Sequence, residues 1–209
     1  MPAPEYHEQL WREVPPGCPP AQFEPRLAFL RRHVPAGARV LDVGCGEGAF
    51  AGAIAAADAV VTGIDVAREP LRRAAERHPG LDLRLVTAEP PHWPLPDVAF
   101  DLVWAGEVLE HVADTAGWMS EVRRVLRSGG TLVMSTPDHG PLARLALGLS
   151  RPAFDRHFDP RSDHLRFYTR HTLAVLLSEF RFEDVRLAGL GGLPGARRTI
   201  LASARRARF

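Results

Sequence analysis

Lysine is absent from this sequence: all 26 basic residues of the 209-residue chain are arginine. Without lysine the chain cannot form a Schiff base, which excludes pyridoxal-phosphate catalysis. The lysine of a standard phosphate-binding P-loop is missing as well. Cysteine is scarce, with only Cys18 and Cys45. Two cysteines are too few for a disulfide framework and favour a reducing compartment.

Long apolar runs and a strong net charge are also missing. No window approaches the roughly 18 uninterrupted apolar residues of a membrane span, and the first residues lack the basic-then-apolar layout of a secretory signal. The formal net charge is only +1, so the chain has no broad attraction for nucleic acid. We therefore expect a cytoplasmic protein and do not favour nucleic acid as its partner, although a local patch could still bind it.

What the sequence does contain is a regular alternation of β-rich apolar runs and helical patterns. We expect strands at 38–43, 60–65, 81–88, 100–105, 130–136, 182–188 and 198–204. We expect helices at 22–33, 49–57, 68–78, 113–127 and 171–179. This alternation predicts a single doubly wound, Rossmann-like α/β domain with a mostly parallel seven-stranded sheet. The last link is too short for a crossover helix, so the last strand should be antiparallel.

Two segments interrupt this pattern. Residues 1–21 are rich in proline and predict a loosely ordered N-terminal arm preceding a 22–209 domain. Residues 138–168 break the alternation and predict an insertion, of which 141–149 is apolar enough for a short helix. Three interpretations of that helix stay open: packing on the core, a lid over the site, or contact with a membrane surface.

A glycine-rich turn follows the first expected strand. Gly44, Gly46 and Gly48 allow a sharp turn and a close approach of ligand to backbone, at the strand ends where such folds bind ligands. The glycines also satisfy a dinucleotide fingerprint. Asp42 could face a methionyl ammonium group, and Asp65 could accept hydrogen bonds from two ribose hydroxyls. With no lysine to support hydride transfer, these carboxylates favour S-adenosylmethionine over a nicotinamide cofactor.

Four stretches then carry a family resemblance: VLDVGCGEG, GID, PLPDVAFDLVWAGEVLEHV and RVLRSGGTLVMSTP. Over roughly residues 35–190 the chain resembles class I S-adenosylmethionine-dependent methyltransferases of the small bacterial type. The resemblance implies S-adenosylmethionine as cofactor and S-adenosylhomocysteine as product. The cofactor-binding residues that it implies are Asp42, Gly44, Gly46, Gly48, Asp65, Val66, Ala88, Glu89, Ala105 and Gly106.

A second group of residues follows the fourth expected strand. Glu107, Glu110 and His111 are spaced i, i+3 and i+4, so on a helix they would share one face. This E-x-x-E-H stretch is similar to that of polyprenyl-catechol O-methyltransferases. Together with DHLRFYTR, which contains His164, it also resembles small-RNA 3′-terminal ribose 2′-O-methyltransferases. The second resemblance implies Glu107, Glu110, His111 and His164 as candidate ligands of a divalent metal.

The alternative to a metal is a histidine acting as general base, because its ordinary pKa is near neutral. His111 and His164 are the leading candidates, followed by His157 and His139. We favour the metal-free interpretation, and O-methylation of a small-molecule hydroxyl as the reaction. N-methylation of an amine, RNA terminal-ribose 2′-O-methylation and a non-catalytic cofactor-binding module are the alternatives.

Overall fold

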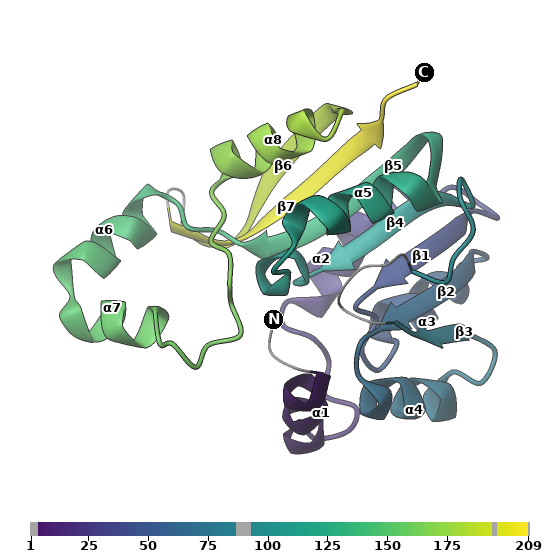
Figure 1. Cartoon of the computed structure of the whole chain (residues 1–209), viewed down its shortest axis with the longest axis horizontal. Helices are drawn as coiled ribbons and strands as arrows, with labels where there is room; N and C mark the ends of the chain where they lie inside the picture. Colours follow the sequence, from purple (N-terminus) through teal and green to yellow (C-terminus); the bar gives the residue numbers. More distant parts are fainter. Residues whose placement is uncertain (1–3, 87–92, 194–195, 209) are drawn as a thin grey trace.

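The computed structural model describes residues 4–86, 93–193 and 196–208, which form one seven-stranded sheet with the order β3-β2-β1-β4-β5-β7-β6 (Figure 1). The strands are β1 (Arg39–Val43), β2 (Val60–Asp65), β3 (Asp82–Leu85), β4 (Phe100–Gly106), β5 (Leu126–Pro137), β6 (Phe182–Leu193) and β7 (Ala196–Arg206). The strands β1 to β5 pair in parallel, and β7 runs antiparallel to both β5 and β6. The predicted fold class is therefore confirmed, including the antiparallel last strand.

Helices cover both faces of this sheet. They are α2 (Phe23–Arg31), α3 (Ala49–Ala55), α4 (Arg68–Arg77), α5 (Thr115–Val125) and α8 (Arg170–Glu179). One core is built from α2 and α3 against the sheet, with Leu30 and Trp104 fully buried in it. The other core lies beneath α5 and α8, where Met119 and Leu173 are fully buried. The two cores make the sheet rigid and fix where its strands end.

The order of the strands places a crevice between β1 and β4. From β1 the chain proceeds to β2 and β3 on one side, and β4 and β5 lie on the other. Val43 and Ala105 are register partners in the β1–β4 pair, so the residues that follow them, Gly44 and Gly106, emerge side by side. Ligands of open α/β sheets bind at such a switch point, beyond the carboxyl ends of the strands.

The N-terminal arm contains a helix, α1 (Pro4–Glu13), where a loosely ordered segment was predicted. It lies beside α4, at the edge of the sheet where β1, β2 and β4 end (Figure 1). The prolines that suggested disorder flank this helix, with Pro4 as its first residue and Pro15 two residues beyond its end. A proline at the start of a helix is compatible with it, because the first N–H has no intrahelical partner.

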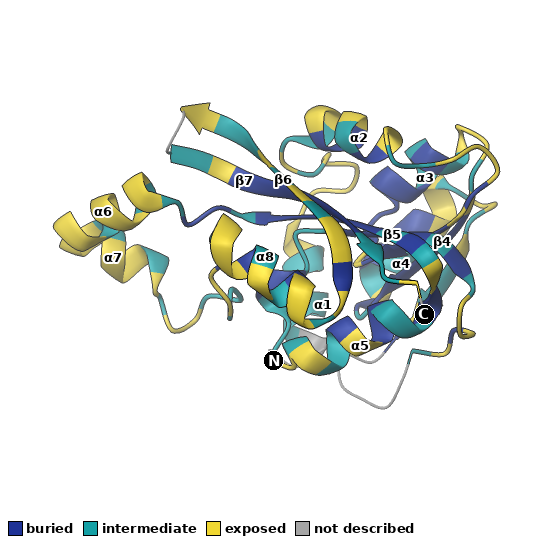
Figure 2. Cartoon of the chain, turned by 90° about the horizontal axis from the view of Figure 1, so that it is seen from above, coloured by how far each residue is buried: buried dark blue, intermediate teal, exposed yellow. Residues whose placement is uncertain are grey.

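The insertion forms a projecting pair of helices, α6 (Pro141–Leu149) and α7 (Arg151–His157). Neither helix contains a buried residue, and Leu145, Leu149 and Phe154 are exposed (Figure 2). This overturns the interpretation in which 141–149 packs into the core. Within residues 4–86, 93–193 and 196–208, no helix combines the length and apolar character needed to cross a bilayer.

Candidate active site

A pocket of about 390 Å³ opens at the carboxyl ends of β1, β2 and β4. Its lining comes from the ends of these strands, from the segment between β4 and α5, from α5 itself, from the insertion and from α1. The polar and glycine residues of its lining are His7, Gly44, Asp65, Glu107, His111 and Asp163. The pocket thus joins residues from the glycine turn with residues from the second predicted group.

The three glycines of the turn have different surroundings. Gly44 lines the pocket at φ 67°, and a Cβ there would collide with the side chain of Val108. Gly46 lies against the indole of Trp11. Gly48 faces Ala74 and His78 at the α4 side, away from the pocket lining. Gly44 is therefore the glycine with direct access to a ligand, whereas Gly48 allows α3 and α4 to approach each other.

Asp65 is held rigidly at the end of β2. Its Oδ2 accepts a hydrogen bond from Gly46 N at 2.9 Å, and its Oδ1 accepts one from Ala67 N at 3.0 Å. Burial raises the pKa of Asp65, although both hydrogen bonds oppose that shift. Each carboxylate oxygen keeps a further acceptor site, and both Asp65 and its neighbour Val66 line the pocket.

Other predicted cofactor residues lie behind this lining. Asp42 is 2% exposed, and nothing in the described part of the chain donates a hydrogen bond to its Oδ2. Burial raises the pKa of Asp42 to about 8, and the nearby Asp65 adds to the shift. Ala105 is fully buried in the core, and Gly106 follows it at the end of β4. Ala88 and Glu89 fall outside the described residues.

A buried arginine from α2 lies beside these carboxyl groups, and sequence reasoning missed it. Arg26 is 2% exposed, and its guanidinium lies 5.0 Å from the ring centroid of Phe50. Its Nη2 is 4.0 Å from Glu107 Oε1, and it packs against Gly106. Burial lowers the pKa of Arg26, while the charges of Glu107, Glu110 and Asp42 oppose that shift. Arg26 therefore brings positive charge to a site rich in carboxylates.

The predicted helix that contains Glu107, Glu110 and His111 does not form, because Glu107 lies outside the helical residues. Only Leu109–His111 forms a short 3₁₀ helix (η1), and Glu107 has a φ of 58°. The chain turns away at Glu107 because its Oε1 accepts a 2.7 Å hydrogen bond from Ser135 Oγ while its backbone N–H donates to Ser135 O. Glu107 therefore lines the pocket, whereas Glu110 is buried behind the lining.

Glu110 is almost completely buried, at 1% exposure. Its Oε2 accepts a hydrogen bond from Thr136 Oγ1 at 3.0 Å, whereas Oε1 has no hydrogen-bond partner among the described residues. Burial raises the pKa of Glu110 to about 8, and the nearby Glu107 adds to the shift. At neutral pH this carboxyl group is therefore mostly protonated and uncharged.

His111 is oriented by the insertion. Its Nδ1 lies 3.0 Å from the backbone oxygen of Asp163 and 3.4 Å from the Asp163 carboxylate. Both partners are acceptors, so Nδ1 carries the proton and Nε2 has a free lone pair. Burial lowers the pKa of His111, although Asp163 opposes that shift. The imidazole is therefore neutral at neutral pH, as a general base must be.

Backbone contacts explain why His111 and His164 meet. Leu165 N and Arg166 N donate to Glu110 O at 2.8 and 3.0 Å, which fastens the end of the insertion to η1. The rings of His111 and His164 consequently lie 4.9 Å apart. His111 and His164 are therefore neighbours because the end of the insertion bonds to the backbone of η1.

Three of the four candidate metal ligands come together. Glu110, His111 and His164 offer ligand atoms that all lie within 4.8 Å of one another, whereas Glu107 is not part of this set. A carboxylate and two imidazoles suit a transition metal better than Mg²⁺. The orphaned Glu110 Oε1 fits such a ligand, but the raised pKa of Glu110 means that metal binding must displace a proton.

The two remaining histidine candidates lie apart from the pocket lining. His139 Nε2 and His157 Nε2 are 3.0 Å from each other, and His139 Nδ1 is 3.2 Å from Tyr168 O. Both ring nitrogens of His139 and the Nε2 of His157 thus have partners within the insertion. Of the four candidate histidines, all of which the structure describes, only His111 lines the pocket, and His164 lies beside its ring.

The fold and the pocket define a Rossmann-like protein with a pocket beyond the carboxyl ends of β1, β2 and β4, and comparison with known proteins identifies the family. Residues 41–134 match the family profile described as "Methyltransferase domain". A ubiquinone biosynthesis O-methyltransferase from Thiobacillus denitrificans is 32% identical over 186 residues, which covers 82% of this chain and 79% of the relative. This chain belongs to the S-adenosylmethionine-dependent methyltransferase family.

Two further similarities agree with this. A ubiquinone biosynthesis O-methyltransferase from Pseudomonas aeruginosa is 40% identical over 114 residues, which covers 53% of this chain. This chain spans about half of that relative, with 49% covered. The solved structure of Haemonchus contortus phosphoethanolamine N-methyltransferase 2 with S-adenosyl-L-methionine superposes with a TM-score of 0.72 at 17% identity, covering 97% of this chain and 56% of the other. That similarity shows the fold.

Proposed function

We propose that this protein transfers a methyl group from S-adenosylmethionine to a hydroxyl group of a small-molecule acceptor. The single observation that carries the proposal is the position of His111. Its Nδ1 is engaged by Asp163, and the residue lines the same pocket as Gly44 and Asp65. A neutral imidazole beside the cofactor turn suits an acceptor that must lose a proton. The O-methyltransferases among the relatives support a hydroxyl acceptor.

The cofactor has a defined place in this proposal. Gly44 would lie under the methionine end, Asp65 would bind the two ribose hydroxyls, and Val66 would pack on the adenine. Asp42 would supply the counter-charge for the ammonium group, and the guanidinium of Arg26 beside Glu107 would supply it for the carboxylate of the same methionine end. Ala105 and Gly106, at the end of β4, would lie beneath the sulfonium. Gly46, Gly48, Ala88 and Glu89 stay predictions from the family resemblance.

When bound, the cofactor would supply an electrophilic methyl group to the acceptor oxygen and would leave as S-adenosylhomocysteine. The pocket residues hold the reactants in line, which provides much of the acceleration. His111 Nε2 takes the hydroxyl proton, and Asp163 stabilises the imidazolium that forms at Nδ1. The ring centroid of His164 lies 4.9 Å from that of His111, so His164 supports the base from outside the pocket lining.

One observation supports the metal-free form of this proposal. Glu107 is engaged by Ser135 and lies near Arg26, and it does not belong to the cluster of Glu110, His111 and His164. If a metal is bound here, Glu110, His111 and His164 would hold it, and it would acidify an acceptor hydroxyl.

The proposal is tested by product analysis. We expect incubation with S-adenosylmethionine carrying a trideuterated methyl group, and a panel of catechols, phenols and amines, to give labelled products from hydroxyl acceptors. Excess chelator should leave this turnover unchanged. Mass spectrometry identifies the products and the atom methylated. Turnover that chelator abolishes and Mn²⁺ restores would overturn the metal-free form, and labelled amines alone would overturn O-methylation.

Cofactor binding should release protons from Asp42. At pH 7 this carboxyl group is mostly protonated, because burial raises its pKa to about 8. The cofactor ammonium lowers that pKa again, so binding of S-adenosylhomocysteine at pH 7 should release a substantial fraction of one proton. Calorimetry in two buffers of different ionisation enthalpy measures the release.

The control for this measurement is Asp42→Asn, which has no proton to release. We expect its binding enthalpy to be nearly the same in both buffers. Equal enthalpies for the native protein would mean that Asp42 does not change its protonation when the cofactor binds.

A further inference from the structure

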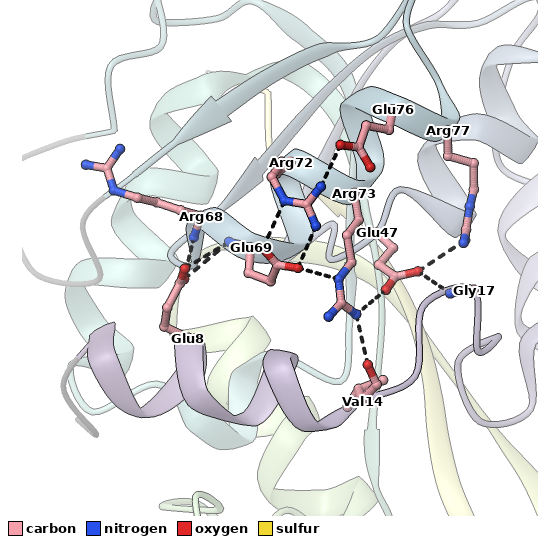
Figure 3. A network of polar contacts seen from close by, with 10 residues as sticks. All are labelled: Glu8, Val14, Gly17, Glu47, Arg68, Glu69, Arg72, Arg73, Glu76 and Arg77. Atoms are coloured by element: carbon pink, nitrogen blue, oxygen red, sulfur yellow. Dashed lines mark hydrogen bonds and ion pairs between the residues drawn. The ribbon is translucent and has the colours of Figure 1, made fainter.

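The N-terminus of α4 is capped by a residue from α1 (Figure 3). Ala67, at the N-cap position of α4, makes no side-chain hydrogen bond to the helix. Instead, the carboxylate of Glu8 accepts hydrogen bonds from Arg68 N at 2.7 Å and from Glu69 N at 3.1 Å. A carboxylate in this position satisfies free amides and interacts favourably with the helix dipole. A residue 60 positions away thus provides a contact that is usually local.

The segment after α1 is tied to the glycine turn itself. Val14 O accepts a hydrogen bond from Arg73 Nη1 at 2.9 Å, and Gly17 N donates to Glu47 Oε2 at 2.8 Å (Figure 3). Arg73 and Glu47 form a buried ion pair at 2.8 Å. Glu47 stands between two glycines of the cofactor turn. The arm is therefore fixed at one end to α4 and at the other to the cofactor-binding loop.

The inner face of α1 forms a wall of the pocket. His7, Leu10 and Trp11 of α1 all line it, as does Val14 just beyond the end of the helix, and the four are spaced i, i+3, i+4 and i+7. Trp11 covers Gly46 so closely that its indole lies 2.9 Å from where a Cβ on that glycine would be. The ring of His7 is 6.3 Å from that of His111. One helix thus covers both the cofactor turn and the side of the pocket that holds the base.

A second carboxylate, that of Asp65, lies next to the contact between Glu8 and α4. Asp65 accepts a hydrogen bond from Ala67 N at 3.0 Å, and Glu8 bonds the next two amides along the chain. The residue proposed to bind the ribose and the residue that holds α1 therefore bond consecutive N–H groups.

We propose that Glu8 is a positioning residue that holds α1 closed over the bound cofactor. This rests on the proposed binding of S-adenosylmethionine in the same pocket. Because Trp11 covers the glycine turn, the cofactor enters and leaves when α1 moves away, and the Glu8 contact to α4 must break for that motion. Glu8 consequently controls how long the cofactor and its product stay bound.

The test compares three variants of the full chain. Glu8→Ala removes the cap, Glu8→Gln keeps an acceptor oxygen but loses the charge, and Glu13→Ala changes an exposed glutamate on the same helix. We expect Glu8→Ala to raise the dissociation rate of S-adenosylhomocysteine about tenfold or more, since it loses two charge-assisted hydrogen bonds. Glu8→Gln should restore part of the slow rate, and Glu13→Ala should match the native protein. Stopped-flow displacement measures these rates.

A second measurement needs no cofactor. In the ligand-free protein, Glu8→Ala should speed amide hydrogen exchange within residues 4–13 and at Arg68 and Glu69, while α5 exchanges as in the native protein. If this exchange changes but S-adenosylhomocysteine does not bind the native protein, the proposed function fails and the cap stands. The role of Glu8 would be overturned if S-adenosylhomocysteine dissociated from Glu8→Ala as slowly as from the native protein. It would also be overturned if Glu13→Ala raised the dissociation rate as much as Glu8→Ala does.

Discussion

Replacing His111 with glutamine should lower kcat for a hydroxyl acceptor by about 10²–10⁴-fold, the usual contribution of a positioned general base. Glutamine keeps a polar side chain but cannot accept a proton from the acceptor. The binding of S-adenosylhomocysteine should change little, because the variant leaves Gly44 and Asp65 in place. Steady-state kinetics on an acceptor found in the product analysis measures the first effect, and calorimetry measures the second.

The control for this variant is His171→Gln on α8, where the histidine is exposed and lies outside the pocket lining. We expect it to retain native kcat. A larger loss in His164→Gln than in His111→Gln would assign the base to His164 and make His111 its neighbour. An unchanged kcat in both would remove the histidine base from the mechanism.

The pH dependence of the same reaction should identify this base. His111 must be unprotonated to accept a proton, so activity rises with pH through its pKa. Burial lowers that pKa, so the rise should lie below the ordinary histidine value of about 6.5. Asp163 opposes the shift, and Asp163→Ala should therefore move the rise to still lower pH. A rise that stays in place in Asp163→Ala would show that another group titrates.

The sheet could be predicted from sequence because its signals are local. Apolar runs alternate with helical patterns, and the link before β7 is too short for a crossover, so the mostly parallel sheet and the antiparallel direction of its last strand followed from chain geometry. Glu107 could not be placed in this way. The E-x-x-E-H spacing fits a helix, but Ser135 engages Glu107 in a turn with positive φ. That partner lies 28 residues away, and periodicity contains no information about it.

The arm shows a different limit of sequence reasoning. Its prolines indicated disorder, although His7, Leu10, Trp11 and Val14 already have the spacing of an apolar helix face. So short a helix has little stability of its own. It forms here against α4, where the Glu8 carboxylate accepts hydrogen bonds from two backbone amides. The apolar spacing of this helix was present in the sequence, but its contact with α4 could be identified only in the folded structure.

The second large effect is expected from Asp65→Ala, which should weaken S-adenosylhomocysteine binding by tenfold or more. The variant removes two hydrogen bonds from the ribose hydroxyls to a charged acceptor, each worth about 1.5–3 kcal/mol. It also frees Gly46 N and Ala67 N, which Asp65 now holds. The glycine turn should therefore loosen, and the melting temperature should fall together with the affinity.

Asp65→Asn separates these two roles. Asparagine keeps one acceptor oxygen for a backbone N–H but loses the charge and the second acceptor, so its affinity should lie between those of Asp65→Ala and the native protein. Calorimetric titration gives the affinities, and thermal unfolding without ligand gives the structural cost. If Asp65→Ala is folded and binds S-adenosylhomocysteine as the native protein does, Asp65 is not the ribose ligand. If it loses affinity only as far as its unfolded fraction accounts for, its role is to hold the turn.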